Sequence, residues 1–201
     1  MNEIKLKGFI RDISRSHSIG DIEYDKANFV VNRDGLYDDV LSLRFKRFSN
    51  TYKDGDEIKL LGNIRSYSSH LEDGKNKVEV YVFTYFDSPE DLEDSTNEVT
   101  LDGRICKLDG IRILNNGKKN IHFIIANNLD IGDNGKKLNS YIPCVAWGKN
   151  AKAISRLKVN DKIKLYGRLQ SREYKKFISE NEYEIRVAHE VYVKSFEVAN
   201  D

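Results

Sequence analysis

The chain has 201 residues, of which 39% are hydrophobic and 32% are charged, and its formal net charge is +1. This length is enough for one large domain or two small ones, each with a packed core. No run of about 18 or more apolar residues occurs, which excludes a transmembrane helix, and the N-terminus lacks the apolar core of a secretion signal, so we expect a cytoplasmic protein.

The charge is distributed unevenly along the chain. Residues 1–95 contain 14 Lys and Arg against 19 Asp and Glu, a net charge of −5, whereas residues 96–201 contain 19 against 13, a net charge of +6. Five acids of the first half lie between Asp87 and Asp94, so the rest of that half is neutral. The second half is therefore the part that we expect to face a polyanion.

The sequence repeats itself once. Asn2–Ile10 matches Asn97–Ile105 at an offset of 95 residues, and Asp56–Ile64 matches Asp161–Leu169 at an offset of 105 residues. Two matches in the same order, with a period near 100 residues, indicate two copies of one module rather than a solenoid.

Both copies show the alternation of β-strands. In the first copy the expected strands are Glu3–Ile13, Ala27–Val31, Val40–Phe45, Asp56–Ser66 and Lys77–Phe86. In the second copy they are Val99–Leu108, Lys119–Ala126, Leu138–Trp147, Lys162–Tyr174 and Glu182–Phe196, with a helix expected over Lys149–Leu157. Five strands with a helix between the third and the fourth is the order of the OB-fold, a small, partly open Greek-key barrel.

We therefore predict an all-β protein with two tandem OB-folds, each a five-stranded Greek-key barrel with a short helix between strands 3 and 4. The first OB-fold is expected at residues 1–87, an acidic linker at 88–96 and the second OB-fold at 97–201. In each copy a glycine recurs at the same phase of two strands, at Gly8 and Gly62 and again at Gly103 and Gly167, where a bend or bulge would let a small barrel close.

The fourth strand of the second copy has two different faces. Ile163, Leu165, Gly167 and Leu169 share one face, because side chains alternate along a strand. The other face carries Lys162, Lys164, Tyr166, Arg168, Gln170, Arg172 and Tyr174. Cations neutralise phosphates and aromatic rings stack on unpaired bases. The residues of this strand alone leave open a solvated polar face with incidental tyrosines.

The third strand adds two large rings to one face. Ile142, Cys144 and Ala146 share the small face, which suits a tight barrel interior, whereas Tyr141, Pro143, Val145 and Trp147 share the other. This second face fits nucleic-acid stacking, with a subunit contact or plain core as the alternatives. In the first copy, the alignment of Leu43–Lys46 with Val145–Gly148 places Phe45 opposite Trp147 and Asp39 opposite Tyr141. The first barrel is thus expected to be degenerate for binding, and to serve as a weaker site or an interface.

Enzymatic motifs are not found. There is neither a phosphate-binding Gly-x-x-x-x-Gly-Lys-Ser/Thr loop nor a Gly-x-Ser-x-Gly nucleophile elbow, and the four histidines have no metal-ligand spacing. Cys106 and Cys144 lack a Cys-x-x-Cys companion, which favours reduced core thiols over a disulfide or zinc site. We expect no catalytic residues, no metal and no cofactor.

The second copy resembles the bacterial single-stranded DNA-binding protein family over roughly residues 97–196. The resemblance is carried by Asn97–Ile105, Asn116–Lys118, Phe123–Ala126, Ile142–Ala151 and Lys162–Tyr174. It implies an OB-fold that binds single-stranded DNA without catalysis, in which rings at the positions of Tyr141, Trp147 and Tyr174 stack on bases. We add Tyr166 and Phe123 as candidate stacking residues. The candidate phosphate-binding residues are Arg104, Arg112, Lys118, Lys149, Lys162, Lys164, Arg168, Arg172, Lys175 and Lys176.

The resemblance also suggests partners and a setting. The family usually assembles four single barrels, so a chain with two barrels is expected to form a homodimer. In the family an acidic C-terminal tip recruits replication and repair proteins. We expect no such tip in Glu197–Asp201, and replication or repair proteins remain candidate partners. We expect a nucleoid-associated role in DNA replication, recombination or repair, and a phage, plasmid or other mobile element as one setting. An OB-fold scaffold in a replication complex and an RNA-binding protein remain the alternatives.

Overall fold

The structure is a computed structural model that describes residues 1–33, 37–47, 52–70, 76–84, 97–130, 137–179 and 182–199, with the backbone alone at residues 69, 70, 76, 77 and 130. The expected linker, residues 88–96, lies outside the described residues. The elements within them are β1 (Asn2–Ile19), β2 (Ile22–Arg33), β3 (Tyr37–Lys46), β4 (Glu57–His70), β5 (Asn76–Thr84), β6 (Asn97–Leu108), β7 (Arg112–Ile113), β8 (Lys119–Asp130), β9 (Lys137–Trp147), α1 (Gly148–Ile154), β10 (Lys162–Phe177) and β11 (Tyr183–Val198).

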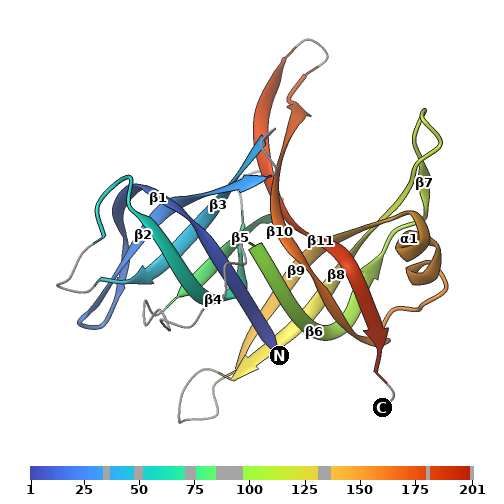
Figure 1. Ribbon diagram of the computed structural model, residues 1–201, viewed down its shortest axis with the longest axis horizontal. Coiled ribbons are helices and arrows are strands. Elements are labelled where there is room, and N and C mark those ends of the chain that lie inside the picture. Colours follow the sequence, from blue (N-terminus) through green and yellow to red (C-terminus); the bar gives the residue numbers. More distant parts are fainter. Residues whose placement is uncertain are drawn as a thin grey trace.

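The strands close two barrels that lie side by side (Figure 1). In the first barrel, β1 pairs with both β2 and β4, and the circuit runs β1-β2-β3-β5-β4. In the second, β6 pairs with both β8 and β10, and the circuit runs β6-β8-β9-β11-β10. In each barrel one pairing is parallel, between β3 and β5 and between β9 and β11. The prediction of an all-β protein with two OB-folds is confirmed.

Among the described residues, the helix expected between the third and fourth strands occurs in the second copy and not in the first. Ala151 and Ile154 of α1 are fully buried against the second barrel. Between β3 and β4 the described residues, 47 and 52–56, contain turns and no helix. Cys144 is buried as expected, but Cys106 is exposed, because it occupies an irregularity of β6 between Ile105 and Lys107 that turns its side chain out of the core.

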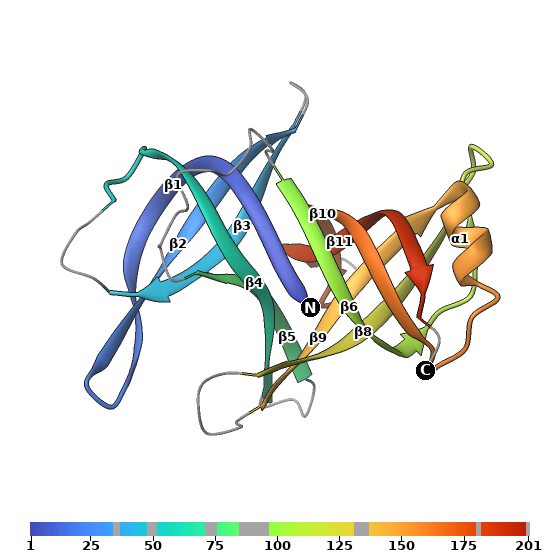
Figure 2. The same cartoon turned by 60° about the horizontal axis from the view of Figure 1, so that its bottom comes forward.

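One continuous sheet joins the two barrels. β1 and β6 pair antiparallel along the centre of the molecule, from Asn2 opposite Leu101 to Leu6 opposite Asn97 (Figure 2). The pairing is symmetric, because Ile4 and Val99 face each other and are equivalent positions of the repeat. The two barrels are therefore related by an approximate two-fold axis through this pair.

Two buried asparagines secure this junction in equivalent ways. The Asn97 side chain donates to the Leu169 carbonyl at 2.7 Å and accepts from the Leu169 amide at 3.0 Å. Asn2 makes the same pair of bonds with Ile64, at 2.7 and 2.8 Å. Each amide thus satisfies backbone groups that would otherwise be buried without partners.

A second pair of contacts fixes the true alignment of the two copies. The Tyr141 amide donates to Ser66 Oγ at 2.7 Å, and the Val40 amide donates to Ser171 Oγ at 3.0 Å. Ser66 and Ser171 are equivalent in the repeat, so Val40 is the counterpart of Tyr141.

The strand pairings give the same alignment, with Leu43 opposite Val82 in the first barrel and Cys144 opposite Val191 in the second. The counterpart of Trp147 is therefore Lys46, and the expected correspondence with Phe45 is wrong by one residue. Phe45 points into the first barrel, where the second barrel has Ala146.

The recurring glycines mark close approaches between strands. A Cβ on Gly103 would lie 2.4 Å from the Ala126 carbonyl oxygen, and one on Gly167 would lie 2.1 Å from that of Tyr192. Gly167 also adjoins a bulge in the β10–β11 pairing. These positions exclude a side chain because two backbones cross there, as barrel closure requires.

Replacing Gly103 by alanine should destabilise the second barrel. The new methyl group would collide with the Ala126 carbonyl and with Ile125 Cγ2, at 2.4 and 2.5 Å, so we expect a loss of roughly 1–3 kcal/mol in the free energy of unfolding. Urea denaturation measures it. Gly110→Ala is the matched control, since nothing lies within 4 Å of its Cβ position; equal stability of the two variants would contradict the explanation.

Candidate nucleic-acid interface

The outer face of β10 carries cations above aromatic rings. Lys164 Nζ lies 5.3 Å from the centre of the Tyr166 ring, and Arg168 Cζ lies 5.0 Å from the centre of the Tyr192 ring on β11. Ile163, Leu165 and Leu169 point into the barrel and are buried. The expected division of this strand into an apolar and a basic, aromatic face is therefore confirmed, and its cations lie within cation–π distance of the rings.

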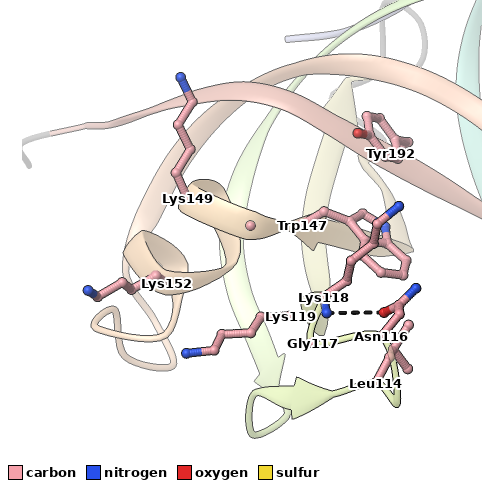
Figure 3. A pocket seen from close by; sticks show the side chains of 10 residues that line it. Leu114, Asn116, Gly117, Lys118, Lys119, Trp147, Lys149, Lys152 and Tyr192 are labelled. Carbon is pink, nitrogen blue, oxygen red and sulfur yellow. Dashed lines mark hydrogen bonds between the residues drawn. The ribbon is translucent and has the colours of Figure 1, made fainter.

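Trp147 lies in a cleft at the end of β9. Gly148 has a φ of 55°, which lets the chain turn directly from β9 into α1 and leaves Trp147 at the corner. The opposite wall is the turn between β7 and β8, where the Lys118 amide donates to Asn116 Oδ1 at 3.1 Å (Figure 3). We call this space the Trp147 cleft, and its volume is about 770 Å³.

The Trp147 cleft combines two rings with positive charge. Its lining consists of Leu114, Asn116, Gly117, Lys118, Lys119, Trp147, Gly148, Lys149, Lys152 and Tyr192. Four of these residues are lysines and none is acidic. In Figure 3 the amino groups of Lys119, Lys149 and Lys152 point away from the Trp147 ring. The cleft thus offers a flat apolar surface with cations around it.

Three charged or aromatic residues of this cleft, Tyr192, Lys119 and Lys152, were not among the expected site residues. Tyr192 stands between the buried Val191 and Val193, so the alternation of β11 already placed it on the outer face. Lys119 directly follows the expected Lys118, and Lys152 comes three residues after the expected Lys149, but only the fold brings the β7–β8 turn and α1 to the same cleft.

The other expected rings lie elsewhere on the same barrel. Tyr141 is 47% exposed, at the junction with the first barrel, and Tyr174 is 37% exposed, with Arg172 Cζ 5.7 Å from its ring centre. Tyr174 lines a second cavity rather than the Trp147 cleft. Tyr166 is half-buried under Lys164.

The expectation that Phe123 stacks on bases is wrong. Its side chain is 2% exposed and belongs to the hydrophobic core of the second barrel. Ile121, Phe123 and Ile125 alternate along β8 and all point inward, so Phe123 cannot reach a ligand on the outer face.

The ten expected phosphate-binding side chains all reach the surface. Lys164, Arg168 and Lys176 are half-buried and the other seven are exposed. Only Lys118 and Lys149 of the ten line the Trp147 cleft. Others have protein partners, since Arg104 donates to the Asn160 carbonyl at 2.9 Å and Lys175 lies 4.2 Å from the Tyr183 ring centre.

Glu190 is a buried carboxylate that three side chains of the second barrel contact. Gln170 donates to Glu190 Oε1 at 3.0 Å, His122 Nδ1 lies 3.6 Å from Oε2, and Arg172 Nε lies 3.4 Å from Oε1. Burial raises the pKa of Glu190, but the contacts with His122, Gln170 and Arg172 outweigh it, so its pKa lies below the usual value. Glu190 therefore stays ionised and holds Arg172 in place on the outer face.

Comparison with known proteins identifies the second copy. The profile of the single-strand binding protein family matches residues 96–198. The chain belongs to the single-strand binding protein family. Proteins of this family bind DNA without catalysis, which confirms the expectation that the chain is not an enzyme. Among curated proteins, none matches the chain.

Solved structures resemble the whole chain. The wild-type single-stranded DNA-binding protein of Thermus aquaticus superposes with a TM-score of 0.73 at 17% identity, over 100% of this chain and 94% of that one. A deletion mutant of the same Thermus aquaticus protein gives 0.72, also at 17% identity, over 100% and 95%. The likeness in fold therefore includes both barrels.

No helix in the described part of the chain is long and apolar enough to span a membrane.

Glu190→Gln should destabilise the protein in a pH-dependent way. A carboxylate with a lowered pKa contributes stability that is present above its ordinary pKa of 4.5 and is lost as the pH falls through the lower value. We expect the variant to be roughly 1–3 kcal/mol less stable at pH 7, with a smaller difference at about pH 3. Urea denaturation at both pH values tests this. The exposed Glu182→Gln is the control, and a difference that does not change with pH would contradict the role of Glu190.

Proposed function

We propose that the chain binds single-stranded DNA, largely independently of sequence, through the outer face of its second barrel. The observation that carries the proposal is the Trp147 cleft, whose lining contains two aromatic rings, four lysines and no acidic residue. Membership of the single-strand binding protein family supports it.

The chemistry of the cleft suits an unpaired base. Stacking of a base on an aromatic ring contributes about 1–3 kcal/mol and tolerates any sequence, because every base has a π-face. The rim lysines would neutralise neighbouring phosphates and release counterions. Duplex DNA has no free base face to offer, so the rings select the single strand.

The proposed binding residues extend beyond the cleft. Tyr141, Trp147, Tyr166, Tyr174 and Tyr192 are the proposed stacking residues. The proposed phosphate-binding residues are Arg104, Arg112, Lys118, Lys119, Lys149, Lys152, Lys162, Lys164, Arg168, Arg172, Lys175 and Lys176.

The proposed organisation follows the repeat. Residues 1–87 form a first OB-fold reduced for binding, 88–96 an acidic linker and 97–201 the binding OB-fold. In the first barrel, Lys46 and Val40 stand where the second has Trp147 and Tyr141. We propose a homodimer with four barrels, active in DNA replication, recombination or repair, in the nucleoid or on a mobile element.

A second candidate function is an interaction subunit of a replication complex. One observation favours it: the β10–β11 hairpin, which projects from the barrels in Figure 1, exposes large apolar side chains. Phe177 is 67% exposed, Ile185 55% and Tyr183 47%. In this case the hairpin would bind a protein, and contact with DNA would be weak.

Binding should be visible in the fluorescence of the chain's one tryptophan. Oligo(dT) stacked on Trp147 should quench it. For about three to five phosphate contacts, affinity should fall roughly ten- to hundredfold between 50 and 200 mM salt. A competition with oligo(U) measures the preference for DNA over RNA. Absence of both quenching and retention on single-stranded DNA at low salt would refute the proposal.

The double variant Trp147→Ala, Tyr192→Ala separates the two candidate functions. Because both rings are on the outer face, we expect the variant to stay folded, to lose roughly a hundredfold or more in DNA affinity and to keep its oligomeric state. Tyr37→Ala, at a ring 73% exposed on the first barrel, is the control. Fluorescence anisotropy of labelled DNA and solution mass, expected at twice the 23.2 kDa of one chain, provide the two measurements. Unchanged DNA affinity would favour the interaction subunit.

A further inference from the structure

A second cavity, of about 530 Å³, lies between the two barrels. We call it the inter-barrel cavity. The first barrel contributes Lys26 of β2 and Arg44 of β3 to its lining, and the second contributes Pro143, Arg172, Tyr174 and Glu190, among others. It is therefore built jointly by the two copies of the repeat, and neither barrel alone would form it.

The inter-barrel cavity lies on the same face as the Trp147 cleft. Pro143 and Trp147 point outward from β9 four residues apart, a separation of roughly 14 Å along a strand. On β11, Glu190 lines the inter-barrel cavity and Tyr192, two residues on, lines the Trp147 cleft. A nucleic-acid strand that follows these two strands away from Trp147 thus arrives between the barrels.

The charges of the inter-barrel cavity suit a phosphate. Arg44 is paired with Glu79 at 3.2 Å, and Arg172 with Glu190 at 3.4 Å. Both carboxylates of the lining are thereby neutralised, and Lys26, which is exposed, supplies a further positive charge. The Tyr174 ring offers a face for a base beside these cations.

The relative position of the barrels at this cavity is fixed by direct contacts. A ring nitrogen of His189, on β11, lies 2.9 Å from the Val40 carbonyl oxygen on β3. The Ser171 amide donates to Asp39 Oδ1 at 2.8 Å. Asp39 is buried and is also bound by Arg33 at 2.6 Å. The cavity is thus held open by a rigid junction rather than by chance contact of two domains.

We propose that the first barrel takes part in the proposed binding at a subsite in the inter-barrel cavity, where Lys26 binds the phosphate next to a base stacked on Tyr174. The proposal rests on the proposed function, because the same strand occupies the Trp147 cleft. It gives the first barrel a role in binding although Lys46 and Val40 stand there in place of Trp147 and Tyr141.

The experiment compares Lys26→Ala with Lys53→Ala, an exposed lysine of the same barrel outside the cavity. Two ligands are used: oligo(dT) of about 2 nucleotides, which is too short to extend from the Trp147 cleft into the inter-barrel cavity roughly 14 Å away, and oligo(dT) of about 30 nucleotides, which spans both barrels. Trp147 fluorescence reports both. For the long ligand, we expect Lys26→Ala to bind about fivefold more weakly, with a salt slope smaller by about 0.7. Short-ligand binding should equal that of the wild type.

Two outcomes would overturn the subsite. The first is that Lys26→Ala binds the long ligand with the same affinity as Lys53→Ala. The second is that Tyr174→Leu binds the long ligand as tightly as Tyr174→Phe, which keeps the aromatic ring. These outcomes differ from a failure of the proposed function, in which the wild-type chain would bind neither ligand.

Discussion

The pairing of β1 with β6 is the constraint on which the rest of the molecule depends. It merges two barrels into one sheet and places equivalent residues, Ile4 and Val99, face to face. Asn2 and Asn97 satisfy the buried backbone groups beside the pair, so neither strand can shift without leaving polar atoms unbonded. Because this junction is rigid, the outer face of the second barrel ends against the first, and a cavity forms between them.

The difference between the two barrels comes down to where a ring points. In the first barrel, Phe45 fills the interior; in the second, small residues, Cys144 and Ala146, fill the same layer, and the ring of Trp147 stands outside. Successive side chains of a strand face opposite ways, so a displacement of one residue converts a core ring into a surface ring. Gly148 completes the arrangement, since its positive φ starts α1 directly after Trp147 and opens the cleft.

Much of the fold could be predicted because period-two alternation and a repeat are local signals. The strands, the helix after Trp147 and the split faces of β9 and β10 all follow from them. The site was predicted less completely. Tyr192 stood in an alternating segment and could have been found, and the inward phase of β8 could have excluded Phe123. Lys119 and Lys152, by contrast, enter the site through contacts between elements distant in sequence, which spacing along the chain does not reveal.

The sequence by itself determined the two barrels, their core faces and the basic, aromatic character of the second copy, because these depend on which residues alternate along single strands. Only the tertiary structure decided how the copies align, with Lys46 rather than Phe45 opposite Trp147, since that depends on hydrogen bonds between strands. It alone also placed Lys26 of the first barrel and Tyr174 of the second in the lining of one cavity. The distance between such residues is set by the packing of one barrel against the other, and no local pattern encodes it.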